Sequence, residues 1–348
     1  MMPKFWMVAA LSLAVIVLGA CGSEEAAPTS APTPTSTPTT SPTPSPTATA
    51  TSVPEPSPNP PIEVLFSVFP VGHEPTALAF DGDAIWVANG DDDSVTKLAL
   101  DGTELGTFSV GVRPLALAFD GESIWVANKG PFNDPSPGTV TKLGLDGSEL
   151  GTFQAGVGPA ALVFDGENIW VANKGILDDP SPGTVTKLAL DGLELGSFPV
   201  GAGPTALAFD GENIWVANLE DGTVSKLALD GKPLGTFKVG IGPTALAFDG
   251  ESIWVAHTDD GTLGQLALDG TILDVFSVNP TLTALIFDGN NLWVGNYYST
   301  VIQLALNGST ALSFNVGSTL SALVFDGKSL WLAYFFDDSV GKLTIVEE

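Results

Sequence analysis

The side chains that most often carry out chemistry are scarce in this sequence. Its 348 residues include one cysteine, Cys21, and two histidines, His73 and His257. One thiol cannot form an intrachain disulfide or a multi-thiolate metal site, and two imidazoles cannot form a histidine-rich metal cage. The sequence contains no Gly-x-Ser-x-Gly elbow and no phosphate-binding loop. We therefore predict no catalytic residue, and binding is favoured over catalysis.

Acidic residues dominate the charge of the chain. There are 40 Asp and Glu against 12 Lys and Arg, a net charge of −28, which would repel a nucleic acid. Acidic runs occur at 91–93, 178–179, 220–221, 259–260 and 337–338. Ca²⁺ takes about six to eight oxygen ligands, which such loops could offer, but none has the EF-hand spacing. A solvated acidic rim is the preferred interpretation, with no cofactor predicted and Ca²⁺ as the alternative.

A polar side chain recurs at intervals of 38 to 45 residues. The seven positions are Asn89, Asn128, Asn173, Asn218, His257, Asn296 and Tyr334. Brought together in a ring, these side chains would make a polar surface for a protein, peptide or glycan ligand. The alternative is that each asparagine satisfies the backbone of its own loop, as in an Asx turn. His257 and Tyr334 depart from the asparagine pattern.

Apolar loop residues and one arginine complete the set of candidate binding residues. The apolar positions are Phe132, Ile176-Leu177, Tyr297-Tyr298 and Phe335-Phe336. Exposed aromatic rings favour contact with a partner, and the alternative is that they pack on neighbouring elements. Arg113 and Glu74 precede Pro114 and Pro75 in successive repeats, which predicts an exposed ion pair of little energetic weight.

These residues belong to a repeat that covers the chain from residue 62 to its end. Tryptophan marks each unit, at Trp86, Trp125, Trp170, Trp215, Trp254, Trp293 and Trp331. A period near forty residues is typical of a propeller or a solenoid. Each unit contains four short apolar runs, which we name strands A to D. Asp-Gly dipeptides join A to B and C to D, and they favour type I′ hairpin turns with positive φ at both central residues.

The two ends of the repeat region complement each other. Residues 64–68 resemble a D strand but precede the first A strand, and the last repeat stops after strand C. The N-terminal strand therefore supplies the missing strand of the last unit, pairing with residues 339–345. This closure predicts an all-β, seven-bladed propeller of four-stranded antiparallel blades with no open first-to-last edge. A solenoid would need polar caps instead.

Residues 62–348 resemble the repeat superfamily of seven-bladed propellers that includes the NHL, YVTN and virginiamycin B lyase families. The resemblance rests on Gly-Pro before strand A (Gly158-Pro159), on the Asp-Gly turn, and on Ile-Trp-Val-Ala-Asn in strand B. It implies that A strands line a central channel. The A-to-B and C-to-D turns would then lie on one face, and the B-to-C and D-to-A loops on the other.

The virginiamycin B lyase resemblance also implies a possible enzyme, in which a metal and a histidine open a cyclic depsipeptide by elimination. That family's site includes an acid two positions before a histidine. Here Val255-Ala256 precede His257 and Val71-Gly72 precede His73, so the motif is absent. An extracytoplasmic lyase or hydrolase therefore remains the alternative to a binding module.

The variable loops predict which face would bind. The second and third units carry a six-residue insertion between strands B and C, with Asp-Pro-Ser-Pro-Gly-Thr at 134–139 and again at 179–184. Variable loops on a constant scaffold are where a binding site is expected. We therefore predict binding through the B-to-C loops. The alternative is that duplication of one blade copied its insertion.

The N-terminal residues predict where the protein resides. Residues 1–20 read as a signal peptide, with Lys4 before the apolar run 5–17. Leu18-Gly19-Ala20-Cys21 resembles the bacterial lipobox, which implies acylation of the Cys21 thiol and cleavage before it. Residues 22–61 contain 12 prolines and 17 serines or threonines, which predicts a disordered tether. The expected location is outside the cytoplasm, on a bacterial membrane.

Overall fold

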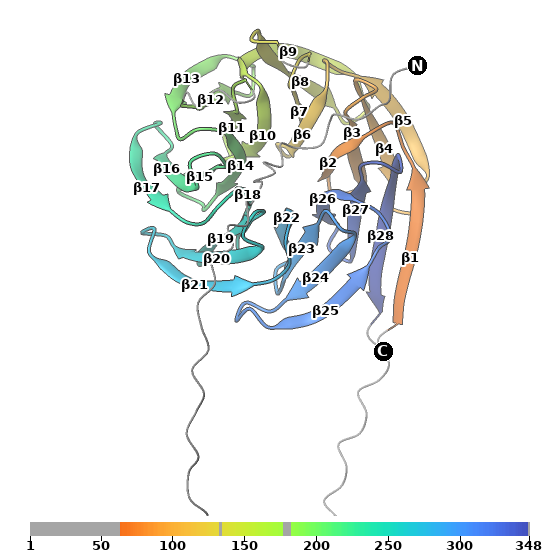
Figure 1. Cartoon of the computed structure of the whole chain (residues 1–348). Coiled ribbons are helices and arrows are strands. Elements are labelled where there is room, and N and C mark those ends of the chain that lie inside the picture. The colour runs from red at the N-terminus through yellow and green to blue at the C-terminus, as the bar shows by residue number, and fades with distance from the viewer. Residues whose placement is uncertain (1–62, 132–133, 177–181, 347–348) are drawn as a thin grey trace, which may run out of the picture. The chain divides into compact units, whose positions relative to one another are not determined.

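The computed structural model describes residues 63–346, except 132–133 and 177–181. Cys21, the predicted signal peptide and tether, and Phe132 lie outside the described residues. The described residues contain no helix and form 28 strands in seven four-stranded antiparallel sheets. The innermost strand of each sheet contacts that of the next, and the last contacts the first (Figure 1). The predicted seven-bladed β-propeller is therefore confirmed.

Each blade contains strands A to D in order from the axis outward. The A strands are β2 (Pro75–Phe80), β6 (Pro114–Phe119), β10 (Pro159–Phe164), β14 (Pro204–Phe209), β18 (Pro243–Phe248), β22 (Leu282–Phe287) and β26 (Leu320–Phe325). The B strands are β3 (Ala84–Asn89), β7 (Ser123–Asn128), β11 (Asn168–Asn173), β15 (Asn213–Asn218), β19 (Ser252–His257), β23 (Leu292–Asn296) and β27 (Ser329–Tyr334).

The outer half of each blade follows the same order. The C strands are β4 (Ser94–Ala99), β8 (Pro137–Gly144), β12 (Thr184–Ala189), β16 (Thr223–Ala228), β20 (Thr262–Ala267), β24 (Thr300–Leu304) and β28 (Ser339–Val346). The D strands are β5 (Glu104–Ser109), β9 (Glu149–Val157), β13 (Glu194–Pro199), β17 (Pro233–Lys238), β21 (Ile272–Ser277) and β25 (Thr310–Asn315), with β1 (Glu63–Pro70) in the last blade.

The N-terminal strand completes the last blade. β1 pairs with β28 in antiparallel register, from Glu63 opposite Val346 to Pro70 opposite Ser339. Phe69 of β1 packs on Trp331, with ring centroids 5.8 Å apart, as a D-strand phenylalanine packs on the tryptophan in each other blade. The predicted closure is therefore confirmed, and it joins residues 269 to 283 positions apart, from Pro70 with Ser339 to Glu63 with Val346.

The Asp-Gly turns differ from the predicted type. In the first C-to-D turn the Gly102 N–H donates to the Ala99 carbonyl, and φ is positive at Gly102 but not at Asp101. The pairing of β4 and β5 then shifts between Lys97 and Leu98. These features are those of a type I turn with a glycine bulge, so the type I′ prediction was wrong. A Cβ on Gly102 would also collide with the Phe69 ring of the preceding blade.

The aspartate of each A-to-B turn is a hydrogen-bond acceptor, buried in the first four blades and half-buried in the last three. Oδ1 of Asp81 accepts the N–H groups of Asp83 and Ala84, and its Oδ2 accepts Trp86 Nε1–H at 2.8 Å. Lys97 Nζ lies 3.3 Å from the same carboxylate and 4.7 Å from the Trp86 ring centroid. It also donates to the Leu145 carbonyl of the next blade, which ties the two blades together.

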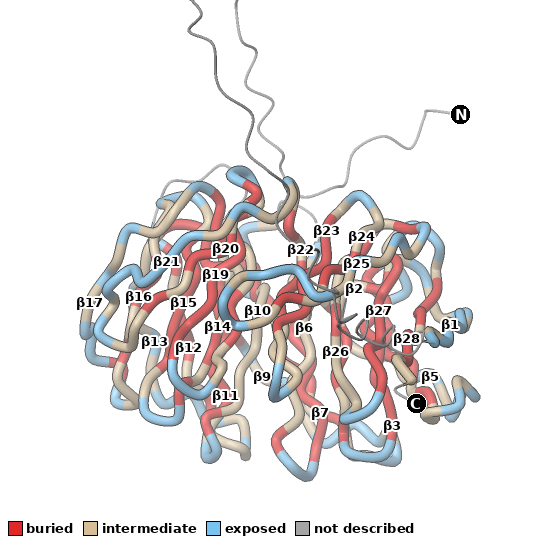
Figure 2. Tube along the Cα trace, turned by 90° about the horizontal axis from the view of Figure 1, so that it is seen from below, coloured by how far each residue is buried: buried red, intermediate tan, exposed pale blue. Residues whose placement is uncertain are grey.

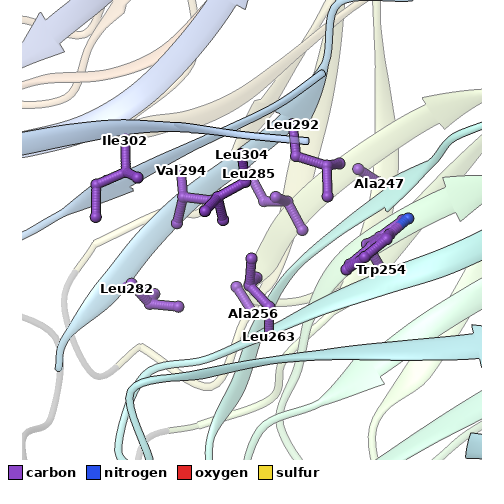
Figure 3. Packing of buried hydrophobic residues seen from close by; sticks show 10 residues of the cluster. All are labelled: Ala247, Trp254, Ala256, Leu263, Leu282, Leu285, Leu292, Val294, Ile302 and Leu304. Carbon is purple, nitrogen blue, oxygen red and sulfur yellow. The ribbon is translucent and has the colours of Figure 1, made fainter. Parts of the chain in front are cut away.

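Apolar side chains fill the spaces between blades. Figure 3 shows one such cluster, in which Trp254 and Leu263 of one blade meet Leu285 and Leu292 of the next. Buried residues follow the inner strands, whereas exposed residues gather in the connections at both ends of the blades (Figure 2). One end carries the Asp-Gly turns and is called the turn face. The other carries the B-to-C and D-to-A connections and is called the loop face.

Candidate functional site

A small cavity lies on the propeller axis. Its volume is about 270 Å³, and residues of all seven A strands line it. Most of the lining is alanine and leucine, such as Leu115, Ala160 and Leu323. Hydroxyl groups link neighbouring A strands: Thr76 donates to the Pro114 carbonyl at 2.8 Å and Ser321, which lines the cavity, donates to the Pro75 carbonyl at 2.5 Å.

The seven polar residues at the ends of the B strands lie inside the blades. Their exposed fractions range from 0% to 4%. Asn89 Nδ2 donates to Ser94 Oγ and Thr96 Oγ1 on the adjacent C strand, and Asn128, Asn173 and Asn218 bond to C-strand hydroxyls in the same way. Two asparagines also accept backbone N–H groups: Asn296 Oδ1 accepts the Thr300 N–H, and Asn173 Oδ1 accepts the Gly156 N–H. The structure thus places these side chains between strands rather than on an open polar surface.

His257 and Tyr334 replace asparagine where the C strand leaves room for a ring. In the first blade Asn89 lies opposite Ser94 and also bonds to Thr96, two residues further along the C strand. The residue at the position of Thr96 is Gly264 in the blade of His257 and Gly341 in the blade of Tyr334. A Cβ on Gly341 would collide with the Tyr334 hydroxyl, and one on Gly264 would lie 3.0 Å from His257 Cε1. Size compensation across two strands therefore explains both departures from asparagine.

Burial shapes the acid–base properties of these two rings. The pKa of His257 is lowered, chiefly because the ring is buried. The charge of Asp260 and a hydrogen bond with Thr262 act in the opposite direction, but their effect is smaller. Burial also raises the pKa of Tyr334, with the Asp337 charge adding to the effect. His257 Nε2 and the Tyr334 hydroxyl have no hydrogen-bond partner among the described residues. Both groups are held neutral at physiological pH.

A Val-Gly or Ala-Gly pair in the D-to-A loop encloses the asparagine position in several blades. A Cβ on Gly111 would lie 2.7 Å from Asn128 Cγ, and one on Gly201 would lie 2.6 Å from Asn218 Cγ. The recurring glycine is therefore required by close packing over the end of strand B. This pair was a signal, present in the sequence, that the asparagine side chains would be covered.

Several acids of the loop face accept backbone N–H groups. Asp92 Oδ2 accepts the His73 N–H at 2.7 Å, Asp221 Oδ2 the Ala202 N–H at 2.6 Å, and Asp260 Oδ2 the Ile241 N–H at 2.7 Å. The predicted acidic rim thus includes carboxylates that hold the D-to-A loops in place. Asp178 and Asp179 lie outside the described residues.

The described residues do not fit a metal centre of the kind that the lyase resemblance implies. No group of three or more His, Cys, Asp or Glu among them is placed to hold a metal ion. His257 is enclosed, and His73 Nδ1 lies 2.9 Å from Asp92 Oδ1. We therefore derive no reaction step through a metal.

The aromatic loop residues form a cluster on the loop face of the last two blades. Tyr297 packs edge-on against Tyr298 and Phe336, with ring centroids 5.7 and 6.4 Å apart, and Phe335 packs edge-on against Phe336 at 5.0 Å. Tyr298 is 61% exposed and Phe336 52%, whereas Phe335 is half-buried. Of the four aromatic residues that the sequence predicted for this cluster, Tyr298 and Phe336 are therefore the accessible ones.

Arg113 lies in the D-to-A connection of the loop face, directly before β6. Its φ of 56° is in the left-handed region, and its N–H donates to Asp93 Oδ1 at 2.8 Å. Its carbonyl accepts the Lys129 N–H at 3.0 Å. Arg113 thus lies two residues before Leu115, which lines the axial cavity.

Similarity to known proteins is confined to the fold. No protein-family model and no curated protein matches the sequence. Virginiamycin B lyase from Staphylococcus aureus superimposes with a TM-score of 0.68 at 16% identity, over 82% of this chain and 100% of that one. A streptogramin B lyase gives 0.67 at 16% identity, over 81% and 98%. Hydrazine synthase from Kuenenia stuttgartiensis gives 0.63 at 17% identity, over 79% and 96%. All three share the propeller architecture of this chain.

Proposed function

We propose that this protein is an extracytoplasmic, lipid-anchored bacterial protein whose propeller binds a protein, peptide or glycan through its loop face. The observation that carries the proposal is the cluster of Tyr297, Tyr298, Phe335 and Phe336, which leaves large aromatic surfaces in solvent. Interfaces concentrate their energy in a few aromatic anchors. The turn face repeats one Asp-Gly formula and offers no comparable cluster among the described residues.

Substitution of the aromatic anchors tests the binding face. Tyr298→Ala and Phe336→Ala should each weaken partner binding by about 2 kcal/mol if they are hot spots. Leu193→Ala is the matched control, because Leu193 is 62% exposed and lies beside a turn on the opposite face. The measurement is capture of partners from cell-envelope extract, followed by affinities for each purified partner. Loss of binding in Leu193→Ala alone would show that the binding surface lies on the turn face.

Cys21 is the proposed point of attachment to the membrane. The support is the lipobox-like Leu18-Gly19-Ala20-Cys21 and the Pro-, Ser- and Thr-rich segment after it. Within the described residues there is no helix with the length and hydropathy needed to cross a membrane. Cells fed a labelled fatty acid should label the wild-type protein but not Cys21→Ser. Label persisting in Cys21→Ser would exclude this anchor.

The second candidate is an extracytoplasmic lyase. The support for it is the shared fold, since one of the similar structures is a catalytically inactive virginiamycin B lyase with quinupristin, at a TM-score of 0.67 and 16% identity. Incubation of this protein with quinupristin and Mg²⁺ decides between the candidates. A binding module leaves the depsipeptide ring intact, whereas ring opening that is lost in His73→Ala or His257→Ala would establish the lyase.

A further inference from the structure

Each blade ends outward in a D strand with one free edge. The D strand is the outermost strand of its sheet, so its outer edge pairs with no other described strand (Figure 1). Such an edge exposes backbone N–H and C=O groups with which another chain can pair, and proteins protect it with bulges, charged side chains or proline. The seven blades can therefore be compared for how well the same edge is protected.

A bulge interrupts six of the seven D strands. In every blade except the last, the pairing of strands C and D shifts by one residue. β1 instead pairs with β28 over eight consecutive residues without a shift. A bulge bends a strand and disrupts its row of backbone groups, whereas a regular strand leaves that row continuous. Among the described D strands, β1 therefore has the most regular edge.

Polar side chains or proline add to the protection in five of the bulged strands. Glu104 of β5 lies opposite Leu98 and accepts the hydroxyl of Thr107 at 3.0 Å. The equivalent residues are Glu149, Glu194 and Pro233 in the next three blades and Thr310 in the sixth. Carboxylates and proline both oppose the addition of a further strand.

β1 has apolar side chains where these residues would be. In the pairing with strand C, Phe66 and Val68 take the positions that Glu104 and Thr107 hold in β5. Leu65 is 52% exposed, Phe66 45% and Val68 51%. No residue from 64 to 70 is charged. A long, regular and apolar edge strand is one that pairs readily with another strand.

The edge of the fifth blade is apolar as well, but it keeps two forms of protection. Ile272, Leu273 and Val275 of β21 are 45%, 54% and 50% exposed. β21 retains the bulge, and Asp274 lies among these residues. β1 therefore differs from the other described D strands in combining a regular edge with uncharged apolar side chains.

A second copy of the chain fits this edge. Two copies with a net charge of −28 repel each other, and the uncharged strand is where their approach is least opposed. A twofold axis perpendicular to the sheet would bring Phe66 and Val68, which share one face of β1, against the same two residues of the other copy. We propose that β1 pairs antiparallel with β1 of a second copy, so that the last blades of two propellers join into one eight-stranded sheet.

The chain before β1 is compatible with this dimer. Residues 22–61 include 12 prolines, which lack the N–H that strand pairing requires, so this segment is a poor occupant of the edge. The two β1 strands would begin at opposite ends of their pair, about 27 Å apart. A proline-rich chain extends about 3.1 Å per residue, so two such segments can reach one membrane from a dimer. This compatibility rests on the proposed Cys21 anchor, whereas the pairing of β1 does not.

Sedimentation of the full-length protein, with detergent micelles in large excess over protein chains, measures the dimer. Wild type should dimerise reversibly, and more tightly at higher ionic strength because salt screens the repulsion between acidic copies. Val68→Lys should weaken dimerisation at least about tenfold, since it places a charge in the apolar contact of both copies. Thr107→Lys, at the equivalent position of β5, is the matched control and should leave it unchanged. A thermal melt verifies that each variant is folded.

Cysteine cross-linking in membranes locates the contact. Residues directly opposite in an antiparallel pair have Cα atoms about 4.5–5.5 Å apart, within reach of a disulfide. A twofold axis near the middle of β1 places residue 66 or residue 67 opposite itself, so oxidation should cross-link either Phe66→Cys or Ser67→Cys into a dimer. Thr107→Cys should remain monomeric. Wild type tests the anchor separately, because an acylated Cys21 has no free thiol to cross-link.

Three results would overturn the inference. They are a monomer at every protein concentration, dimerisation of Val68→Lys as tight as that of wild type, and assembly that continues beyond a dimer, since a twofold pair closes on itself. Cross-linking of wild type through Cys21 would count against the anchor and not against the pairing of β1. The aromatic cluster lies on the loop face, so failure of partner capture there is distinguishable from failure of dimerisation.

Discussion

His73 Nδ1 lies 2.9 Å from Oδ1 of Asp92, at the seam where the last blade meets the first. On the other side of the ring, His73 Nε2 lies 3.7 Å from Asp338 Oδ2 of the last blade. The hydrogen bond with Asp92, and then the charges of Asp92 and Asp338, raise the pKa of His73 above 6.5. Protonated His73 therefore links the two blades that close the ring.

The first prediction concerns pH. Because the folded-state pKa of His73 is raised, its stabilising effect is complete below its unfolded-state pKa of 6.5 and is lost as pH rises through the folded-state value. The effect should be small, since the side chain is exposed. Melting temperatures measured across this range should fall more steeply for wild type than for His73→Gln. Parallel profiles would show that His73 does not contribute to closure.

The second prediction concerns the buried turn aspartates. Asp120 accepts two backbone N–H groups and Trp125 Nε1–H, and its pKa is lowered because these bonds and Lys142 outweigh the effect of burial. Asp120→Ala should destabilise the protein by about 3 kcal/mol, because buried donors and a lysine lose their acceptor. Thermal and denaturant unfolding measure the loss. Asp146→Ala, at an exposed turn of the same blade, should change stability much less.

The third prediction concerns closure by the N-terminal strand. Phe69→Ala and Phe153→Ala remove equivalent rings, but only Phe69 lies in the strand that joins the chain ends. Both variants should lose roughly 2–3 kcal/mol, below the usual cost for a fully buried ring. Deletion of β1 should go further, with aggregation or a melting temperature lowered by several degrees, because it exposes the edge of β28. An unchanged melt after deletion would mean that the ring closes without this strand.

The fourth prediction concerns size compensation between B and C strands. Gly341→Thr alone should destabilise the last blade by about 1–3 kcal/mol, because its side chain would overlap the Tyr334 ring. Adding Tyr334→Asn should restore much of the loss, since the pair then matches Asn89 and Thr96 of the first blade. A double-mutant cycle by chemical unfolding measures the coupling. Additive effects would contradict the compensation.

More of the fold than of the candidate site could be predicted from the sequence. Ring closure could be predicted because residues 64–68 repeat the pattern of a D strand, and the last repeat lacks that strand. The environment of Asn89 could not be predicted in the same way, because strand periodicity does not say which way the terminal side chain of a strand points. The pairing of large rings with Gly264 and Gly341 was the available signal.

The hydrogen bonds that strand lysines donate to the following blade are missing on one side of the ring. Lys187 and Lys226 donate to the Leu229 and Leu268 carbonyls of the following blades, whereas the next two blades have Gln265 and Gln303 at this position. Gln265 bonds within its own blade, to Ser252. Local opening follows the weakest contacts of a fold. Amide hydrogens of β22 to β25 should therefore exchange with deuterated solvent before those of the lysine-linked blades. The propeller ring should open first at this blade.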